Sequence, residues 1–304
     1  MLKQYALDPD VVTDGMAFTA FVGGLGVENG RVMAEYPRIW IRMAIERVRA
    51  MPETREKKRA ELLLERLRTE AQLKCKTGLP FDGTLAWLVN AEHHVDAFDA
   101  VIHPDDVEPS APSERMFPAT SLLEDQPYWQ VNRDVRFRAV AGEFKNLLLP
   151  LARHQSRLAI MDPYFEPQRD TYVQGLKEIM QVPTAPCSVV VHTSAEGTAG
   201  KEIRSSQEWQ EVCSERLSPL VDAGTSLTIV RWNSGASGTR PHARWLVTPL
   251  GGVLVDKGFA VDRRMNSISL MGAVEAARRW AAYGIAPFAV ADYDLRDIVN
   301  VNRG

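Results

Sequence analysis

Short apolar runs separated by amphipathic stretches dominate the second half of the chain. Three of these runs, at 157–161, 188–192 and 226–230, have the length and apolar content of buried strands. Amphipathic stretches near 170–180 and 205–221 follow the first two runs and predict helices, the second of which starts with a Ser-x-x-Glu capping box. This alternation of strands and helices is typical of an α/β sheet.

The remaining elements of this half make the predicted sheet mixed. Segments 244–247 and 252–255 are expected to form a hairpin around Pro249-Leu250-Gly251, so that neighbouring strands run antiparallel there. We also predict helices near 134–153 and 270–283 and a last strand near 288–291.

Residues 1–103 have the spacing of amphipathic helices. Apolar residues recur at helical intervals through Trp40, Ala44 and Val48. A strongly charged stretch follows, and a further helix is predicted over about 83–102. The pattern therefore predicts a mostly helical N-terminal region.

Residues 104–127 differ in composition from the segments on both sides. Five prolines and six acidic residues fall within this stretch. Proline and like charges disfavour regular structure. We therefore expect a helical region over 1–103, a proline-rich acidic linker over 104–127 and an α/β domain over 128–304.

Composition restricts the class of protein without defining its chemistry. The 304 residues are 45% hydrophobic and 25% charged with a formal net charge of −3, which is ordinary for a globular protein. No apolar stretch approaches the roughly 20 residues of a membrane span, and the N-terminus lacks signal-peptide features, so no membrane partner is expected. The three cysteines form no Cys-x-x-Cys pair, which fits a cytoplasmic location.

No cofactor and no metal ion is predicted. The alternative is a divalent-ion site on a helix, formed by five residues that lie close together in the sequence: His93, His94, Asp96, Asp99 and His103. A metal-binding motif such as His-Glu-x-x-His is absent from the sequence. The simpler interpretation is a polar helix face.

The near-neutral net charge conceals two regions of opposite charge. Segment 38–76 carries 12 lysines and arginines against six glutamates, whereas 105–125 carries six acidic residues against one arginine. Four cations cluster in the basic segment: Arg55, Lys57, Lys58 and Arg59. They would contact a phosphate backbone with salt-sensitive affinity. The alternative is a solvated helix whose charges pair with one another.

The strongest chemical signal is His242-Ala243-Arg244. Alternation along a strand puts residues i and i+2 on one face, so the imidazole and the guanidinium would project side by side. Such a pair can attack a phosphorus centre and hold its oxygens, because arginine offers a planar fork of donors. Arg240 and Lys257 flank this segment and are further candidate phosphate-binding residues.

Segment 242–262, which contains His242 and Arg244, resembles the phospholipase D-like superfamily. It is most similar to the divergent branch of that superfamily, which includes the C-terminal domain of MIT-domain proteins. The resemblance rests on the His-x-Arg strand, a turn, a second strand and the stretch from Gly258 to Asp262, and more loosely on Asp162-Pro163-Tyr164-Phe165. It implies a mixed α/β sheet of phospholipase D-like type. It also implies a metal-independent phosphodiesterase or nuclease. In that enzyme His242 would be the nucleophile, Arg244 would clamp the phosphoryl oxygens, and Asp162 or Asp256 would orient the histidine.

Three departures from the family pattern shift the leading expectation away from catalysis. Arg244 stands where the family motif has lysine, Pro249 stands where its aspartate falls, and one motif is present where active members pair two. A homodimer would supply the second histidine. We therefore expect a divergent phospholipase D-like protein that binds a nucleic-acid phosphate backbone or a protein partner. By resemblance it would be an accessory subunit of a bacterial defence or mobile-element system. Hydrolysis by His242 and a non-catalytic scaffold remain the alternatives.

Overall fold

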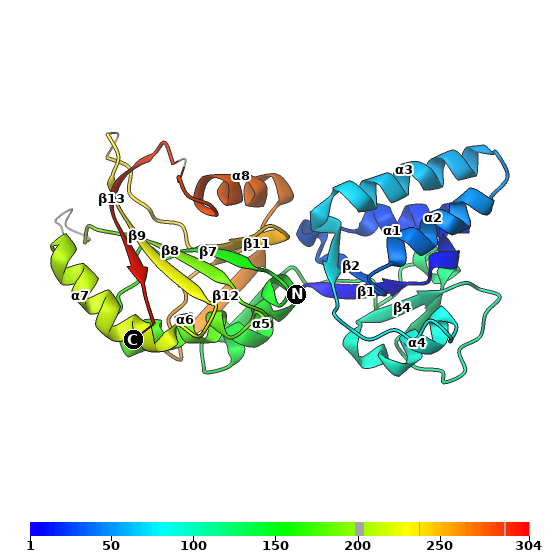
Figure 1. Cartoon of the computed structure of the whole chain (residues 1–304), viewed down its shortest axis with the longest axis horizontal. Helices are drawn as coiled ribbons and strands as arrows, with labels where there is room; N and C mark the ends of the chain where they lie inside the picture. The colour runs from blue at the N-terminus through cyan, green and yellow to red at the C-terminus, as the bar shows by residue number, and fades with distance from the viewer. Residues whose placement is uncertain (198–203, 237, 289, 304) are drawn as a thin grey trace. The chain divides into compact units, whose positions relative to one another are not determined.

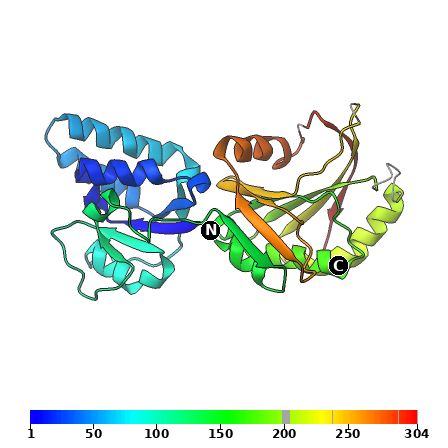
Figure 2. The ribbon, with the colours of Figure 1, turned by 180° about the vertical axis from the view of Figure 1, so that it is seen from behind.

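Two compact units make up the chain, Met1–Arg133 and Asp134–Gly304. The computed structural model describes residues 1–197, 204–236, 238–288 and 290–303. Each unit is built on its own sheet, with helices packed against it (Figures 1 and 2). Within these residues, no helix has the length and apolar content needed to cross a membrane.

Unit 1 contains a five-stranded sheet in the order β3-β2-β1-β4-β5, and all its strands run parallel. The strands are β1 (Lys3–Leu7), β2 (Arg31–Glu35), β3 (Lys74–Lys76), β4 (Ala100–His103) and β5 (Met116–Pro118). The helices are α1 (Gly15–Gly24), α2 (Trp40–Ala50), α3 (Arg55–Thr69) and α4 (Trp87–His93). Short 3-10 helices are η1 (Pro9–Thr13), η2 (Val27–Asn29), η3 (Ala71–Leu73), η4 (Val95–Ala97) and η5 (Ala119–Leu123).

The core of unit 1 has two layers because side chains alternate along each strand. Tyr5 and Leu7 of β1 lie in the cluster that contains residues of α1, α2 and α3. Ala6, between them, lies in the cluster with Trp87 and Leu88 of α4. The sheet is therefore covered on both faces, as parallel sheets usually are.

The prediction of a mostly helical N-terminal region is wrong. The helices α1 to α4 are present, but a parallel sheet lies between them. Its strands are three to five residues long and mostly buried. Short buried strands show no polar alternation, so their apolar runs cannot be told from helix segments by periodicity.

Residues 104–127 also differ from the predicted linker. Met116–Pro118 forms β5 and pairs with β4. Ala119 and Leu122 of η5 are buried in the core of unit 1. Proline is compatible with an edge strand, because one side of such a strand has no neighbouring strand. The missing N–H of the proline then leaves no acceptor of the sheet without its donor. The division between the compact units comes later, after Arg133.

Unit 2 contains an eight-stranded mixed sheet in the order β13-β9-β8-β7-β10-β11-β12-β6. The strands are β6 (Asp134–Arg138), β7 (Arg157–Met161), β8 (Ser188–Ser194), β9 (Ser226–Ser234), β10 (Trp245–Thr248), β11 (Gly251–Val255), β12 (Met265–Leu270) and β13 (Tyr293–Val301). The helices are α5 (Glu143–Ala152), α6 (Asp170–Met180), α7 (Ser206–Leu217) and α8 (Ala273–Tyr283), with the 3-10 helix η6 (Ser218–Leu220).

The central part of this sheet confirms the predicted α/β arrangement. Strands β7, β8 and β9 are parallel, and β10 and β11 form the expected antiparallel hairpin. Helix α8 lies on one face of the sheet, and α5, α6 and α7 lie on the other (Figure 1). Figure 2 brings the paired strands β12 and β6 to the front.

Both ends of the sheet differ from the prediction. The segment predicted as a helix over 134–153 begins with strand β6, which forms an edge of the sheet. The predicted last strand at 288–291 includes residue 289, which lies outside the described residues, and the observed last strand is Tyr293–Val301. Edge strands expose polar side chains, so their apolar signal in the sequence is weak.

Candidate functional site

His242 and Arg244 lie before strand β10, not on it. The strand begins at Trp245, and the Arg244 carbonyl accepts one hydrogen bond from the Val255 N–H, at 2.9 Å. The prediction that His242 and Arg244 lie on a strand and share one of its faces is therefore wrong. Pro241 offers no N–H for a β-ladder, which fits the irregular backbone of this segment.

Tyr164 connects the two residues. Its hydroxyl lies 3.5 Å from His242 Nδ1, and the Arg244 guanidinium lies over its ring, 4.6 Å from the centroid. The three side chains form a row, which we call the His242–Tyr164–Arg244 row. Tyr164 belongs to the segment Asp162-Pro163-Tyr164-Phe165, on which the family resemblance partly rests. No role for the Tyr164 side chain was predicted from the sequence.

Asp162 positions Arg244 rather than His242. Its side chain is 1% exposed, and its oxygens accept backbone N–H bonds from Tyr164 and Phe259, both at 3.1 Å. Arg244 Nε lies 3.9 Å from Asp162 Oδ1. Burial raises the pKa of Asp162, while the two backbone bonds and Arg244 oppose that rise. The predicted role of orienting the histidine is therefore not what this geometry provides.

Asp256 contacts Arg244 through its backbone carbonyl. Its carbonyl accepts a hydrogen bond from Arg244 Nη1 at 2.6 Å, whereas its side chain is exposed. Across the described ranges, no carboxylate is hydrogen-bonded to His242. The arrangement thus holds the guanidinium firmly and leaves the imidazole without an acidic partner.

Gly258 shapes the floor beneath Arg244. Its φ is +75°, and a Cβ atom added there would lie 2.3 Å from Asp162 Oδ2. Asn266 Nδ2 donates to the Gly258 carbonyl at 2.9 Å and keeps this turn in place. Glycine is required because a side chain would collide with the buried carboxylate.

A cavity of about 350 Å³ opens beside His242 and Tyr164. It lies beyond the carboxyl ends of β7, β8 and β9, where ligands of α/β sheets gather. Its cationic lining residues are Arg169, Arg231 and Arg240, and the His242 imidazole lines it as well. Its acidic residues are Glu166 and Glu196, and Pro163, Tyr164, Phe165 and Trp209 supply apolar surface.

An ion-pair network fixes one wall of this cavity. Arg231, whose side chain is 1% exposed, donates from Nε to Asp297 at 2.9 Å and lies over the Trp209 ring. Burial alone would raise the pKa of Asp297, but hydrogen bonds from Arg231 and Ser206 bring it below its usual value. Arg204 pairs with Glu166 at 2.8 Å. These charges are neutralised within the wall.

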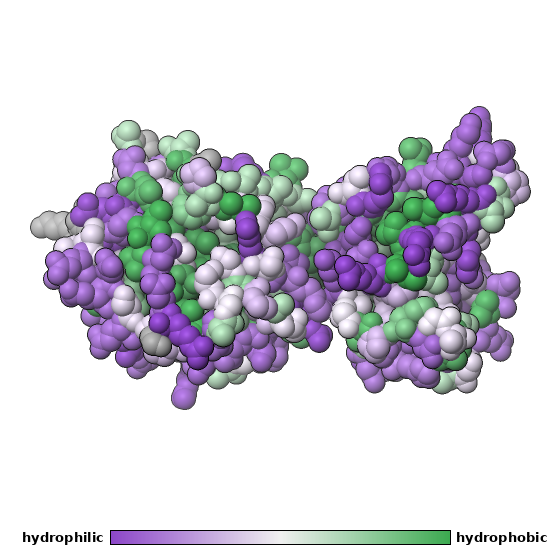
Figure 3. Space-filling view, viewed as in Figure 1, coloured by the Kyte–Doolittle hydropathy of each residue, from purple (hydrophilic) through white to green (hydrophobic). Residues whose placement is uncertain are grey.

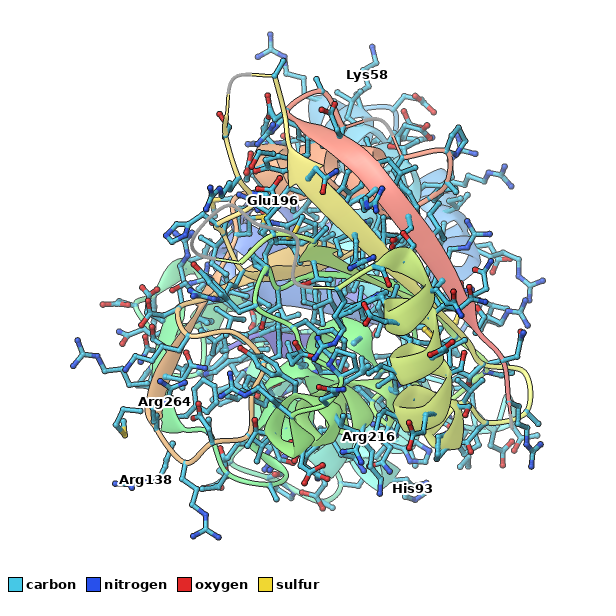
Figure 4. All side chains as sticks on the ribbon, turned by 90° about the vertical axis from the view of Figure 1, so that its left-hand side faces the viewer. Lys58, His93, Arg138, Glu196, Arg216 and Arg264 are labelled. Carbon is cyan, nitrogen blue, oxygen red and sulfur yellow. The ribbon has the colours of Figure 1, made fainter. Side chains whose placement is uncertain are left out.

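Arg240 lies at the rim, as the sequence suggested for a phosphate-binding residue. Its Nε is 3.5 Å from Glu196 Oε2, which also accepts a bond from the Ser234 hydroxyl at 2.6 Å. Figure 4 labels Glu196 near one end of β9 and Arg138 and Arg264 well away from it. Hydrogen bonds from Ser234 hold the pKa of Glu196 below its usual range.

A second hollow, of about 260 Å³, also borders the row. His242 and Arg244 line it together with Leu254, Ser267 and Ser269. Lys257 is exposed in the turn after β11, and its backbone N–H donates to Asn266. His242 therefore lines both hollows.

The basic cluster of α3 is divided by the fold. Lys57 is 8% exposed and pairs with Glu53, so it is not an accessible phosphate contact. Arg55 and Arg59 line a hollow of about 340 Å³, and Lys58 is exposed. Within the residues that the structure places, none of these three forms an ion pair.

The rest of α3 resembles the solvated-helix alternative. Arg66 pairs with Glu70 and Arg68 with Glu65. Farther along the helix, Leu64 lines a hollow with apolar and charged residues of α2 and α3. Figure 3 shows hydrophobic residues among hydrophilic ones on the surface of unit 1. The candidate phosphate contacts of unit 1 are therefore confined to the start of α3.

His192 is buried in unit 2, unlike the exposed His242, and its surroundings are structural. Its Nε2 lies 2.9 Å from the Tyr283 carbonyl, and Trp232 Nε1 donates to its Nδ1 at 3.1 Å. These partners require the neutral tautomer with hydrogen on Nε2. Burial lowers the pKa of His192 to about 4, so it holds α8 against the sheet as a neutral ring.

The candidate metal residues near His93 do not converge. His94 Nε2 contacts the Pro80 carbonyl, and Asp99 accepts a bond from the Gln4 N–H. In the part of the chain that the structure covers, no group of three or more histidine, cysteine or acidic residues could hold a metal ion.

The sequence was compared with models of known protein families and with curated proteins. No family model matches the chain, and no curated protein matches it.

Proposed function

We propose that unit 2 is a divergent phospholipase D-like module that binds the phosphate groups of a nucleic acid without hydrolysing them. The observation that carries this proposal is the His242–Tyr164–Arg244 row at the mouth of a cavity that the exposed Arg169 also lines. The mixed sheet, with a histidine just before its antiparallel hairpin, supports the relationship.

Binding is favoured over catalysis by the environment of the imidazole. A histidine nucleophile needs a partner that fixes its tautomer and orientation. Asp162 accepts bonds from two backbone N–H groups and lies near Arg244. The Asp256 side chain is exposed, and among the described residues it forms no hydrogen bond with His242. A firmly held guanidinium beside an unassisted imidazole suits recognition of phosphate oxygens.

Charge distribution supports an anionic ligand at unit 2. Residues 134–304 contain 20 lysines and arginines against 18 acidic residues, whereas residues 1–133 contain 16 against 21. At the start of α3, Arg55, Lys58 and Arg59 would supply additional contacts to the phosphate backbone.

The test is binding of a fluorescently labelled oligonucleotide, measured by anisotropy over a series of salt concentrations. Arg244→Ala is expected to weaken binding about 10- to 100-fold, because a hydrogen bond to a charged group contributes roughly 1.5 to 3 kcal/mol. It should also reduce the slope of log affinity against log salt by about 1. Lys177→Ala, which removes an exposed cation from α6, is the matched control and should leave both unchanged.

A cleavage assay in EDTA separates binding from hydrolysis. Salt-sensitive binding without cleavage supports the proposal. Cleavage that disappears in His242→Ala would show a metal-independent nuclease and overturn the non-catalytic part. Binding that is equal in wild type and Arg244→Ala would overturn the assignment of the site.

A further inference from the structure

We infer that the cavity beside the His242–Tyr164–Arg244 row receives one unpaired base, so that the ligand is single-stranded nucleic acid. This inference rests on the proposed function and deepens it. It assigns the row to the phosphate and the cavity to the base of the same strand.

The Tyr164 ring offers a stacking surface at the cavity. Arg244 covers one side of the ring and lines only the smaller hollow, whereas Tyr164 lines the cavity and is 41% exposed. Tyr164 therefore borders the cavity, and Arg244 does not. Bases of single strands characteristically stack on such aromatic side chains.

The remaining walls suit a flat ring with polar edges. Pro163, Phe165 and Trp209 provide apolar surface, and Phe165 and Trp209 are themselves buried and fixed. At the rim, the Arg240 guanidinium and the Glu196 carboxylate lie 3.5 Å apart, so that a donor group and an acceptor group stand side by side. Polar groups of both kinds are what hydrogen bonding to a base edge requires.

The two hollows give the strand a path. His242 lines both, so a phosphate at the row would have its base in the larger hollow and its continuing backbone near Ser267 and Ser269. A volume of about 350 Å³ lies within the range of small-molecule pockets. A base that is paired within a duplex would have to leave its stack to enter.

The experiment compares three labelled ligands of equal length: a 12-nucleotide single strand, the same backbone without bases, and the corresponding duplex. The abasic strand keeps the phosphates, so it should bind about tenfold more weakly than the normal strand, with an unchanged salt slope. The duplex should also bind more weakly than the single strand.

Variants of Tyr164 identify the stacking surface. Tyr164→Leu should reduce the difference between normal and abasic strands to less than twofold. Tyr164→Phe, which keeps the ring, should preserve it. Thermal unfolding of each variant, compared with wild type, excludes a loss of fold as the cause.

The outcomes distinguish this inference from the proposed function. Equal binding of normal and abasic strands, with a steep salt slope and sensitivity to Arg244→Ala, would overturn base capture and leave phosphate binding intact. Tighter binding of the duplex would also overturn base capture. Absence of binding to every ligand would overturn the proposed function and the inference together.

Discussion

The buried His192 makes the stability of unit 2 depend on pH. The fold lowers the pKa of this ring from 6.5 to about 4, chiefly through burial, so the folded state favours the neutral form. On acidification the unfolded chain takes up the proton first. Stability from this residue is therefore fully present above pH 6.5 and is lost as the pH falls towards 4.

The magnitude follows from these two pKa values. At pH 5 the unfolded histidine is almost fully protonated and the folded one is mostly neutral, which corresponds to about 2 kcal/mol of lost stability. Asp8, in unit 1, acts in the opposite direction. Burial raises its pKa from 3.8 to about 6, so acidification over the same range favours its folded state. A variant is therefore needed to isolate the contribution of His192.

The perturbation is His192→Gln, which removes the titrating group and keeps a polar side chain. Urea unfolding at pH 8 and pH 5, followed by tryptophan fluorescence, gives the free energy of unfolding of both proteins. Trp232 stacks on His192 and reports on this region directly. The variant should be less stable at pH 8, and its deficit should shrink by about 2 kcal/mol at pH 5. A deficit that stays constant within about 0.5 kcal/mol would refute the reasoning.

Three further perturbations test the site and its supports. Gly258→Ala should lower the free energy of unfolding by about 2 kcal/mol and weaken oligonucleotide binding, because the added Cβ meets a buried carboxylate in a left-handed backbone conformation. Arg231→Met should cost about 3 to 5 kcal/mol in urea unfolding, since it leaves the carboxylate of Asp297 without its ionic partner. Lys58→Ala should reduce the salt slope of binding by about 1, whereas Lys57→Ala should not, because Lys57 is buried and paired.

Controls and contradicting outcomes are defined for each of these predictions. Gly83→Ala, at a glycine with no atom within 4 Å of the added Cβ, should change stability by less than about 0.5 kcal/mol. The double variant Arg231→Met, Asp297→Leu should be more stable than Arg231→Met alone, and the reverse order would contradict an ion-pair role. Equal salt slopes for Lys58→Ala and wild type would contradict a role of the start of α3 in binding the oligonucleotide.

Sequence patterns predicted the centre of unit 2 well because its strands are continuous apolar runs. Strands β7, β8 and β9 and the hairpin after Arg244 are confirmed. The parallel sheet of unit 1 was missed because strands such as Ala100–His103 are too short and too buried to show a period of two. These segments are strands because they pair with segments distant in the sequence. A local pattern of apolar and polar residues contains no information about that pairing.

The candidate site was predicted in part. His242 and Arg244 are neighbours, as the motif suggested, but Tyr164 joins them rather than a common strand face. The cavity also depends on Trp209 of α7 and Arg231 of β9, which lie outside the motif around His242. Only the arrangement of the sheet brings these segments together, so no spacing along the chain marks them.

The anchoring of Arg244 has a consequence for the entropy of binding. Its guanidinium is held by the Asp256 carbonyl, lies near the Asp162 carboxylate and covers the Tyr164 ring before any ligand arrives. A free arginine side chain loses roughly 0.5 to 1.5 kcal/mol of conformational freedom when a ligand immobilises it. Here the fold has already restricted that freedom, so a larger share of each new hydrogen bond contributes to affinity. A lysine at this position would keep the charge but lose the preorganisation.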